Sequence, residues 1–302
     1  MQRLTPLQYI DEVAKAGSIR KAAEILAITP SALNRRVLAV EAELGVAIFE
    51  RMARGVRLST AGEILVHHIR RQVADIERVR SQIADLSGVR RGHVSIACSQ
   101  ALLRHFLPRQ IESYRQAHPA VTFSVYVRDG PAAEKALSDH TADLALIFEP
   151  ERFVDFQTIT TADQPVRAVM RNGHPLADQS RIRLRDCLQY PLAVPLAPSG
   201  VRALLEAVAV HTKARFEPVL QSDNLDLLTG YASIGDTIAF QAAIGLPPAG
   251  EFDDRVSRPI DSRDLQPSVL HMGQLRDRIL PVAAARFADQ LATAFAEDFD
   301  GP

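Results

Sequence analysis

Hydrophobic positions near the start of the chain recur at helical spacing, in segments short enough to be separate helices. The first helix is defined by four apolar residues, Leu7, Ile10, Val13 and Ala14. It ends at Gly17, and Ser18 can accept the first hydrogen bond of a second helix over residues 19–26. Thr29 followed by Pro30 begins a third helix, because a capping hydroxyl and then proline suit a first helical turn. The pattern therefore predicts three consecutive helices.

The third helix has an apolar face and a polar face. Its apolar positions form one stripe that would face the first two helices, at Leu33, Val37, Val40 and Leu44. Its polar positions would point outward, at Ser31, Asn34, Arg35 and Arg36. Two helices joined by the turn at 27–29 match a helix-turn-helix, at about 18–37, in which asparagine can read adenine and arginine can read guanine. The alternative is an ordinary helical hairpin with a solvated polar face.

A short hairpin is expected after the third helix. Residues 47–51 and 56–59 alternate in polarity around a turn at 53–55. Three arginines of this hairpin could reach phosphates or the minor groove beside the helix, Arg51, Arg54 and Arg57. These residues predict the wing of a winged helix-turn-helix. The alternative is that the arginines serve only solubility.

One long helix follows, from about residue 61 to about residue 86, without proline or internal glycine. Its apolar positions follow heptad-like spacing, at Val66, Ile69, Val73, Ile76 and Ile83. Arg80 interrupts the pattern, and Val79 and Leu86 continue it after a slip of one position. A helix of about 25 residues spans roughly 37 Å, which is longer than a domain of this size can cover. We therefore expect the apolar residues to contact a second copy of the chain.

The rest of the chain alternates between strand and helix patterns, which predicts an α/β domain with a parallel sheet. Strands are expected at 93–98, 121–127, 143–148, 166–171, 192–195, 216–221, 237–240 and 269–273. Helices are expected at 99–117, 132–138 and 281–295, and from about Ser199 and Ser222. The last strand and helix would return to the first group, giving two lobes around a cleft.

Two serines are candidates for binding a ligand in that cleft. Ser99 and Ser199 each follow a strand and begin a helix, so each could offer a hydroxyl and free backbone N–H groups to an anion. Gly200 would let a ligand approach the backbone closely. The alternative is that both serines only cap helices. Arg128, in the loop 128–130, could pair with a carboxylate, although a solvated side chain at a strand end is the more frequent case.

Length and charge agree with a division into two parts. The chain has 302 residues, about twice the usual size of one domain. Residues 1–92 carry 15 Lys and Arg against 10 Asp and Glu, a net charge of +5, whereas the remainder carries −6. A basic segment beside an acidic one is typical of a DNA-binding domain joined to a domain that does not contact DNA.

Other features of the sequence exclude several classes of protein. Cys98 and Cys187 are far apart and no Cys or His grouping has metal-ligand spacing, so neither a disulfide framework, a metal site nor a cofactor is expected. Cys98 could act as a redox sensor, but a small buried side chain is the simpler interpretation. There is no signal peptide and no long uncharged apolar stretch, which predicts a cytoplasmic protein without membrane contact.

The first 62 residues resemble the signature of LysR-type transcriptional regulators. The matching positions are Gly17-Ser18, Ala22-Ala23, Leu26, Thr29-Pro30-Ser31-Ala32-Leu33, Glu41, Leu44-Gly45, Phe49-Glu50-Arg51 and Leu58-Ser59-Thr60-Ala61-Gly62. Asn34 departs from the serine that is frequent in the family, which bears on the DNA sequence that is read. The resemblance implies an N-terminal all-α winged helix-turn-helix with a long linker helix, followed by a C-terminal α/β two-lobed domain like that of type 2 periplasmic binding proteins.

The resemblance also sets the expected domains, at 1–62, 63–91 for the linker or dimerisation helix, and 92–302 for the effector domain. The two subdomains of the effector domain would be about 92–162 with 268–302, and 163–267. DNA contacts are expected from Ser18, Thr29, Pro30, Ser31, Asn34, Arg35, Arg36, Arg51 and Arg54. Effector contacts are expected from Ser99, Gln100, Phe148, Ser199 and Gly200, with Arg128 as the weaker candidate.

The expected function is sequence-specific DNA binding that a small-molecule effector, preferably an anion, controls. The expected partners are double-stranded DNA, the effector, further copies in a homodimer or homotetramer, and RNA polymerase. An enzyme is one alternative, but the sequence contains no nucleophile elbow, phosphate loop or dinucleotide fingerprint. A metabolite-binding protein with an accessory DNA anchor is the other.

Overall fold

The computed structural model describes residues 6–86, 91–128, 130–148, 155–197, 199–213, 216–247 and 254–299. The side chains of Arg80 and Leu86 and the whole of Asp129, on which parts of the sequence interpretation rest, lie outside this description. The chain divides into two compact units, residues 1–83 with 139–141, and residues 84–138 with 142–302.

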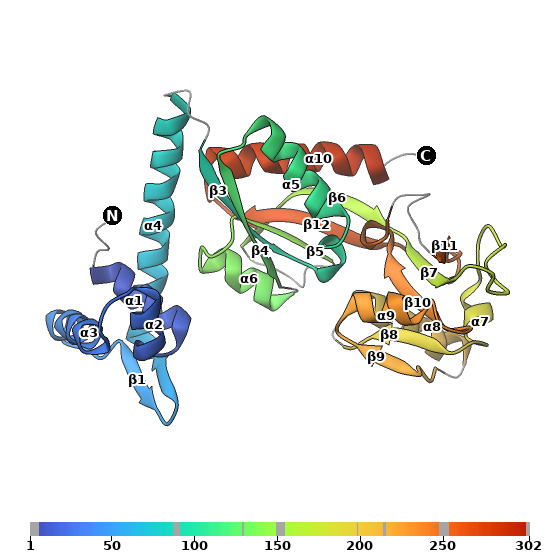
Figure 1. The fold of residues 1–302 in the computed structure, drawn as a ribbon, viewed down its shortest axis with the longest axis horizontal. Coiled ribbons are helices and arrows are strands. Elements are labelled where there is room, and N and C mark those ends of the chain that lie inside the picture. Colours follow the sequence, from blue (N-terminus) through green and yellow to red (C-terminus); the bar gives the residue numbers. More distant parts are fainter. Residues whose placement is uncertain are drawn as a thin grey trace. The chain divides into compact units, whose positions relative to one another are not determined.

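The N-terminal unit contains three helices, a two-stranded wing and a long helix (Figure 1). The elements are α1 (Pro6–Ala16), α2 (Ile19–Ile25), α3 (Pro30–Leu44), β1 (Phe49–Met52), β2 (Gly55–Leu58) and α4 (Thr60–Leu86). Ser18 accepts a hydrogen bond from the backbone N–H of Lys21, and Thr29 accepts one from that of Ala32. Both predicted caps are therefore present, and they fix where α2 and α3 begin.

The core of this unit is formed by the apolar stripe of α3 together with residues of α1, α2 and the wing. Its fully buried members include Ile10, Val13, Ala22, Ala23, Leu33 and Ile48. Leu44, which we expected in the same stripe, is 49% exposed. It is the last residue of α3, because Gly45 adopts a left-handed conformation that ends the helix.

The apolar positions predicted to form one seam on the long helix are buried in its first half and exposed further along. Val66 and Ile69 are only 2% and 1% exposed, because they pack into the core of the same unit. Val73 packs against that core as well. The expectation that Val66 and Ile69 contact a second copy is therefore corrected, because their own chain covers them. Val73 is only half-buried, and for this residue the expectation stays a prediction. Ile76 and Ile83, further along the helix, are 53% and 58% exposed.

The second unit contains two five-stranded sheets, each of which forms one lobe. The first sheet has the order β4-β3-β5-β12-β6. Its strands are β3 (Gly92–Cys98), β4 (Val121–Val127), β5 (Leu144–Phe148), β6 (Phe156–Gln164) and β12 (Ser268–Leu275). Helices α5 (Phe106–Ala117) and α10 (Val282–Phe299) cover one face, and α6 (Pro131–Ser138) covers the other (Figure 1).

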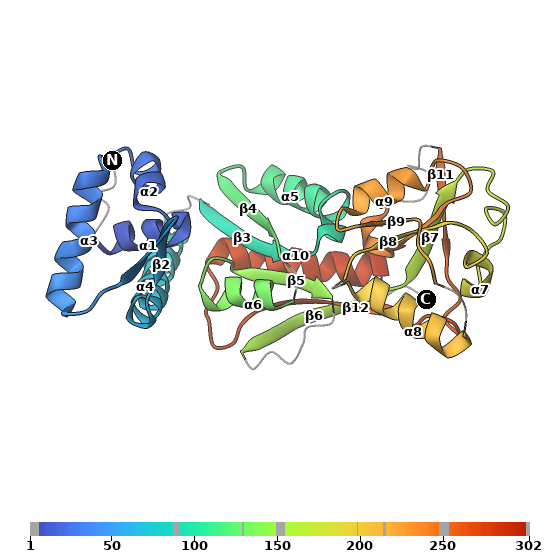
Figure 2. The ribbon, with the colours of Figure 1, turned by 90° about the horizontal axis from the view of Figure 1, so that it is seen from below.

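The second sheet has the order β11-β7-β10-β8-β9. Its strands are β7 (Val166–Arg171), β8 (Leu192–Pro195), β9 (Leu220–Ser222), β10 (Ile238–Ala242) and β11 (Arg255–Pro259). Helix α8 (Gly200–Thr212) packs on one face and α9 (Leu225–Tyr231) on the other, as Figure 2 shows. The short helix α7 (Leu184–Cys187) contributes to the α8 side of the core.

Both sheets are mixed, which corrects the expectation of a parallel sheet. Strand β12 is antiparallel to β5 and β6, and β7 is antiparallel to β10 and β11. Strands β6 and β11 were not predicted. The helix expected from Ser99 is interrupted: a short 3-10 helix, η1 (Gln100–Leu102), precedes α5. Strand β9 is shorter than expected, and Asn224 rather than Ser222 caps α9.

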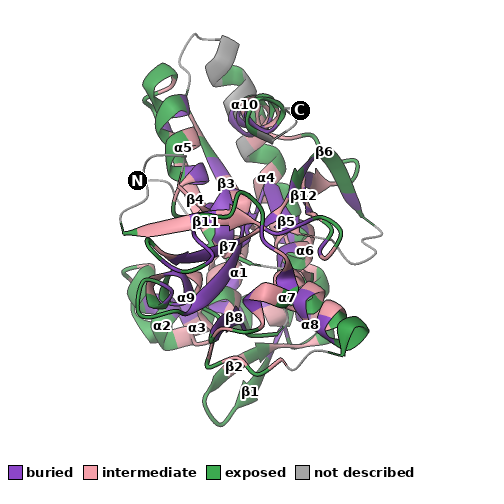
Figure 3. Cartoon of the chain, turned by 90° about the vertical axis from the view of Figure 1, so that its right-hand side faces the viewer, coloured by how far each residue is buried: buried purple, intermediate pink, exposed green. Residues whose placement is uncertain are grey.

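Two connections carry the chain between the lobes. Gln164 ends β6 and Val166 begins β7, and residues 260–267 lead from β11 back to β12. Figure 3 shows that β5, β7 and β8 are largely buried, whereas the wing strands β1 and β2 are mostly exposed. Among the described residues, no helix has the length and apolar character needed to cross a bilayer.

Candidate functional site

The polar face of α3 is available for contact with another molecule. Ser31 and Arg35 are exposed and Asn34 is half-buried. Arg35 makes no hydrogen bond or ion pair with any residue that the structure describes. The guanidinium of Arg36 lies 4.3 Å from the ring centroid of Tyr9, which holds it against α1. Arg35 is therefore the free cation of this face, and Arg36 is restrained.

The hydroxyl groups at the starts of α2 and α3 form hydrogen bonds within the chain. The Thr29 hydroxyl accepts from Ala32 N at 3.3 Å and lies 3.2 Å from the hydroxyl of Ser31. The Ser18 hydroxyl accepts from Lys21 N at 3.4 Å. Pro30 is exposed at the first position of the helix. These groups determine where the polar face begins and how it is oriented.

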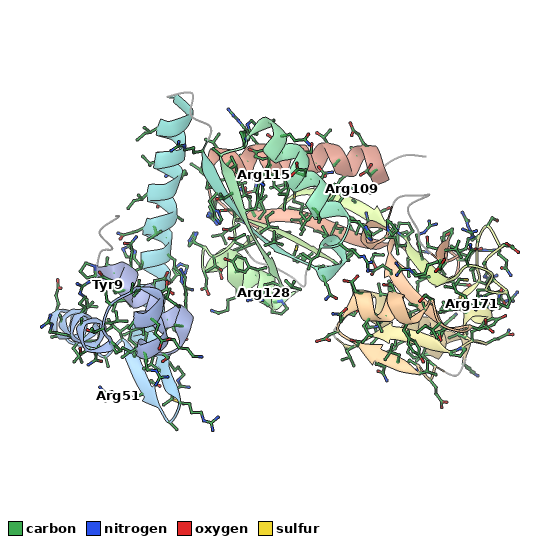
Figure 4. All side chains as sticks on the ribbon, viewed as in Figure 1. Tyr9, Arg51, Arg109, Arg115, Arg128 and Arg171 are labelled. Carbon is green, nitrogen blue, oxygen red and sulfur yellow. The ribbon has the colours of Figure 1, made fainter. Side chains whose placement is uncertain are left out.

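The wing carries two free arginines and one that is paired. Arg51, labelled in Figure 4, and Arg54 are exposed and have no partner in the described part of the chain. Arg57 donates from Nε to Glu50 Oε2 at 3.1 Å, and the hydrogen bond and charge of Glu50 raise the pKa of Arg57. Arg51 and Arg54 are therefore better placed than Arg57 to meet a phosphate.

Glu41 holds the wing to α3. Its Oε1 atom accepts hydrogen bonds from Ile48 N at 2.7 Å and from Phe49 N at 3.1 Å. On the other side, the Ser59 hydroxyl donates to Ala47 O at 2.6 Å. The sequence interpretation gave Glu41 and Ser59 no role, although both belong to the quoted signature. Their contacts fix the position of Arg51 and Arg54 relative to α3.

Gly55 docks the tip of the wing on the turn between α1 and α2. Val56 N donates to Gly17 O at 2.9 Å, and Gly55 has a φ of +98°. A Cβ atom at Gly55 would lie 2.3 Å from Gly17 O, which is closer than any carbon can approach. Only glycine satisfies both the backbone conformation and this contact.

Three predicted effector residues lie together at the carboxyl edge of the first sheet. Strands β4, β3 and β5 are neighbours, and they end at Val127, Cys98 and Phe148. Ser99 N donates to Leu146 O, and Arg128 N donates to Cys98 O, each at 3.0 Å. Because the strands are parallel, the loops that follow them meet at one edge.

The side chains at this edge differ in exposure. Ser99 is 8% exposed and makes no capping bond. Arg128 is exposed, and the one hydrogen bond that its side chain makes with the described residues runs from Nη1 to Val127 O at 2.7 Å. Phe148 is half-buried against the core of the lobe. Cys98 is completely buried, which does not suit a redox sensor. Arg128 is thus the available positive charge here.

Ser199 and Gly200 follow β8 of the second sheet and begin α8. The Ser199 side chain makes no capping bond, so the alternative of a simple cap does not apply in this structure. A Cβ atom at Gly200 would meet nothing within 4 Å, so the space beside this backbone is open. No three Cys, His, Asp or Glu side chains gather as a metal site in the described ranges.

Gln100 is the one predicted effector residue that lines a cavity of about 180 Å³ between the two lobes. Its Oε1 atom accepts from Leu225 N of the other lobe at 2.8 Å. The other five predicted effector residues are not among the residues that line this cavity. The structure thus brings Ser99, Arg128 and Phe148 together at one edge and places Gln100 on a different surface.

Two family models match the chain. The model for bacterial regulatory helix-turn-helix proteins of the lysR family matches residues 4–63, and the model for the LysR substrate binding domain matches residues 87–296. The chain belongs to the LysR family. It is a DNA-binding transcriptional regulator with an effector-binding domain, and its matched families and relatives are regulators rather than enzymes.

Curated relatives and solved structures agree with this assignment. This LysR-family regulator is 27% identical over 266 residues to a probable nitrogen assimilation transcriptional activator of Synechococcus elongatus, covering 85% of this chain and 84% of the relative. It is 28% identical over 237 residues to the transcriptional dual regulator GltC of Bacillus subtilis, covering 77% and 78%.

The fold matches full-length members of the family. The structure of full-length CbnR in complex with its target DNA is 18% identical, with a TM-score of 0.65 over 96% of this chain and 98% of CbnR. A full-length OxyR variant from Pseudomonas aeruginosa is 17% identical, with a TM-score of 0.68 over 98% and 96%.

Proposed function

We propose that this LysR-family regulator inserts the first half of α3 into the major groove of its operator and rests the wing on the phosphate backbone. The observation that carries this proposal is the free, exposed guanidinium of Arg35 on a helix whose opposite face is buried. Arg35 would read guanine and Asn34 adenine. Arg51 and Arg54 would bind phosphates, which adds affinity but little sequence information. Ser18, Thr29 and Pro30 set the orientation of α3, and Ser31 lies at its start.

The regulator acts as a homodimer or homotetramer in this proposal. Ile76, Val79 and Ile83 of α4 are three exposed apolar side chains at spacings of three and four residues, so they share one face of the helix. Such a stripe on a long helix is typical of a contact with a second helix. The segments would be the DNA-binding domain at 1–62, the linker at 63–91 and the effector domain at 92–302. RNA polymerase is the proposed protein partner, and the cytoplasm the proposed location.

The effector is proposed to be a small anion at the carboxyl edges of the strands. Arg128 supplies an exposed positive charge with no carboxylate partner in the described structure. Ser99 and Ser199 supply hydroxyls that make no capping bond. An effector that binds one arrangement of the lobes more tightly shifts the population toward it, and by linkage it changes the affinity for DNA.

Operator binding tests the first part of this proposal. An operator is selected from random duplexes with the full-length protein, and affinities are measured by fluorescence anisotropy from 50 to 300 mM salt. Arg35→Ala is expected to reduce discrimination between the operator and a duplex with one changed base pair by about 1–3 kcal/mol. Arg51→Ala is expected to weaken binding to both duplexes equally and to lower the salt slope by about 1.

Arg115→Ala is the matched control, because Arg115 is an exposed arginine on α5 in the effector domain. It should leave both quantities unchanged. Unaltered discrimination in Arg35→Ala would show that α3 does not read the operator. For the effector, thermal-shift screening of small carboxylates with wild type and Arg128→Ala should give shifts that only the wild type shows. Equal shifts in both proteins would remove Arg128 from the effector site.

A further inference from the structure

Leu38 is an exposed leucine on the outward face of α3. It is 49% exposed, and it belongs neither to the core of the N-terminal unit nor to the apolar residues that pack against that core. Successive residues of an α-helix are about 100° apart around the axis. Leu38 therefore lies about 130° around the helix from the middle of the buried stripe. That stripe consists of Leu33, Val37 and Val40. The Leu38 side chain thus points away from the rest of the unit.

The same face carries the residues that are proposed to read bases. Asn34 and Arg35 lie four and three residues before Leu38, and all three belong to α3. Ser31 lies seven residues before Leu38. Recognition helices in the major groove contact base edges with residues spaced i, i+3, i+4 and i+7, because these positions share one face over two turns. Leu38 thus occupies the fourth position of a face whose first three positions are polar.

The surroundings of Leu38 leave this face open to a duplex. Arg35 supplies a free positive charge beside it. The two carboxylates of α3 do not cover Leu38. Glu41 accepts hydrogen bonds from the backbone of the wing, and Glu43 lies about 140° around the helix from Leu38. The next outward position is Ala42, which is exposed and small. A duplex that contacts Arg35 can therefore approach Leu38 without meeting a negative charge on this helix face.

An apolar side chain in the major groove has one apolar partner on the base edges. This partner is the C5-methyl group of thymine, which 5-methylcytosine also carries, whereas the other groups on the edges are hydrogen-bond donors and acceptors. We infer that Leu38 is a specificity-determining residue that packs against the C5-methyl group of a thymine in the operator. The inference rests on the proposed insertion of α3 into the major groove. Removal of one methyl group from such a contact should weaken binding about fourfold.

The helix geometry also predicts where this thymine lies. Leu38 follows Arg35 by three residues, which is a rise of about 4.5 Å along α3. Neighbouring base pairs are about 3.4 Å apart along the duplex. The thymine should therefore lie within about two base pairs of the guanine that Arg35 reads.

Uracil substitution tests the inference, because uracil differs from thymine only by the missing C5-methyl group. The thymines of the selected operator are replaced by uracil one at a time, and the affinity of the full-length protein is measured by fluorescence anisotropy. One replacement should weaken wild-type binding about fourfold, within two base pairs of the position where Arg35→Ala loses discrimination. At that position Leu38→Ala should bind the thymine and uracil duplexes equally. Leu38→Met keeps an apolar side chain and should retain the preference for thymine.

A cytosine pair at the same position identifies the source of the methyl group. If the contact is to thymine, 5-methylcytosine should bind better than cytosine by the same factor as thymine binds better than uracil, because both methyl groups occupy the same place in the groove. A preference for 5-methylcytosine without any preference for thymine would overturn the assignment to thymine.

Leu44→Ala is the matched control. Leu44 is also 49% exposed and also belongs to α3, but it lies about 120° around the helix from Leu38. Leu44→Ala should therefore retain the full preference for thymine over uracil. Leu38→Ala should keep the thermal midpoint of the wild type, because Leu38 packs in no core of the described chain. If Leu38→Ala does not fold, Leu38→Ser is measured in the same way.

Four outcomes would overturn the inference or the proposal beneath it. Wild type that is insensitive to every uracil would overturn the inference, and so would an equal preference for thymine in wild type and Leu38→Ala. A changed sedimentation coefficient of Leu38→Ala would also overturn it, because Leu38 would then contact another copy. Unaltered discrimination in Arg35→Ala would instead remove α3 from the groove, and with it the proposed function. Loss of discrimination in Arg35→Ala, with thymine preference retained in Leu38→Ala, would remove only the role of Leu38.

Discussion

The attachment of the wing depends on the Glu41 carboxylate. Glu41 Oε1 accepts from Ile48 N and Phe49 N, and both donors belong to buried residues. A hydrogen bond to a charged acceptor contributes about 1.5–3 kcal/mol. Glu41 itself is half-buried, so we take the lower part of that range for the pair. Glu41→Ala should reduce the free energy of opening the wing by about 2 kcal/mol, which corresponds to about 30-fold faster amide exchange.

Hydrogen exchange by mass spectrometry measures this directly, on a peptide that contains Ile48 and Phe49. Glu41→Gln keeps an acceptor oxygen without the charge, so it should lose about 1 kcal/mol, or about fivefold in exchange. Glu43→Ala is the control, because Glu43 is exposed and bonded to no described residue. Operator affinity should fall in the same order. Unchanged exchange in Glu41→Ala would refute the reasoning, and so would an effect of Glu43→Ala of the same size.

Three further predictions concern single residues. Gly55→Ala should lower operator affinity, measured by anisotropy, because a left-handed conformation costs about 1–2 kcal/mol and the Cβ atom would collide with Gly17 O. Burial lowers the pKa of His174, so its contribution to stability is complete above about pH 6.5 and is lost as the pH falls below that value. The free energy of unfolding in urea should therefore differ less between pH 7.5 and pH 5.5 in His174→Gln than in the wild type. Arg278→Met leaves the buried Asp143 carboxylate without its ion-pair partner, and it should lower the free energy of unfolding in urea by about 3–5 kcal/mol. A smaller decrease than in Asp143→Asn would contradict this prediction.

The sequence was most informative where local chemistry decides the structure. Ser18 and Thr29 begin helices because a hydroxyl caps them, and the turn at 53–55 joins two alternating segments. These signals act over a few residues, so they can be read without knowing the tertiary fold. The α3 stripe was predicted correctly up to Val40. Leu44 was not, because the end of the helix at Gly45 removes it from the surface that packs.

Long-range packing accounts for what the sequence did not reveal. Strands β6 and β11 lie at or near sheet edges, where half-exposed polar residues hide the strand pattern. The spacing of Val66 and Ile69 is the same whether these residues pack against a second copy or in the core of their own unit, so the sequence pattern does not distinguish the two cases. The cavity of about 180 Å³ between the lobes is lined by residues from five separate segments of the chain, and no sequence motif marks it. Such properties depend on which segments meet, and spacing along the chain does not encode that.

The path of the chain through the lobes has a consequence for biosynthesis. The first lobe consists of residues 92–164 and 268–299, and β12 lies between β5 and β6 in its sheet. When residue 260 has just emerged from the ribosome, the whole of the second lobe has been synthesised. Strands β5 and β6 still lack β12, the strand that lies between them in the sheet. During that interval both strands present unpaired edges, which are templates for aggregation. The delivery of residues 268–299 therefore decides whether the first lobe of a nascent molecule can complete its sheet.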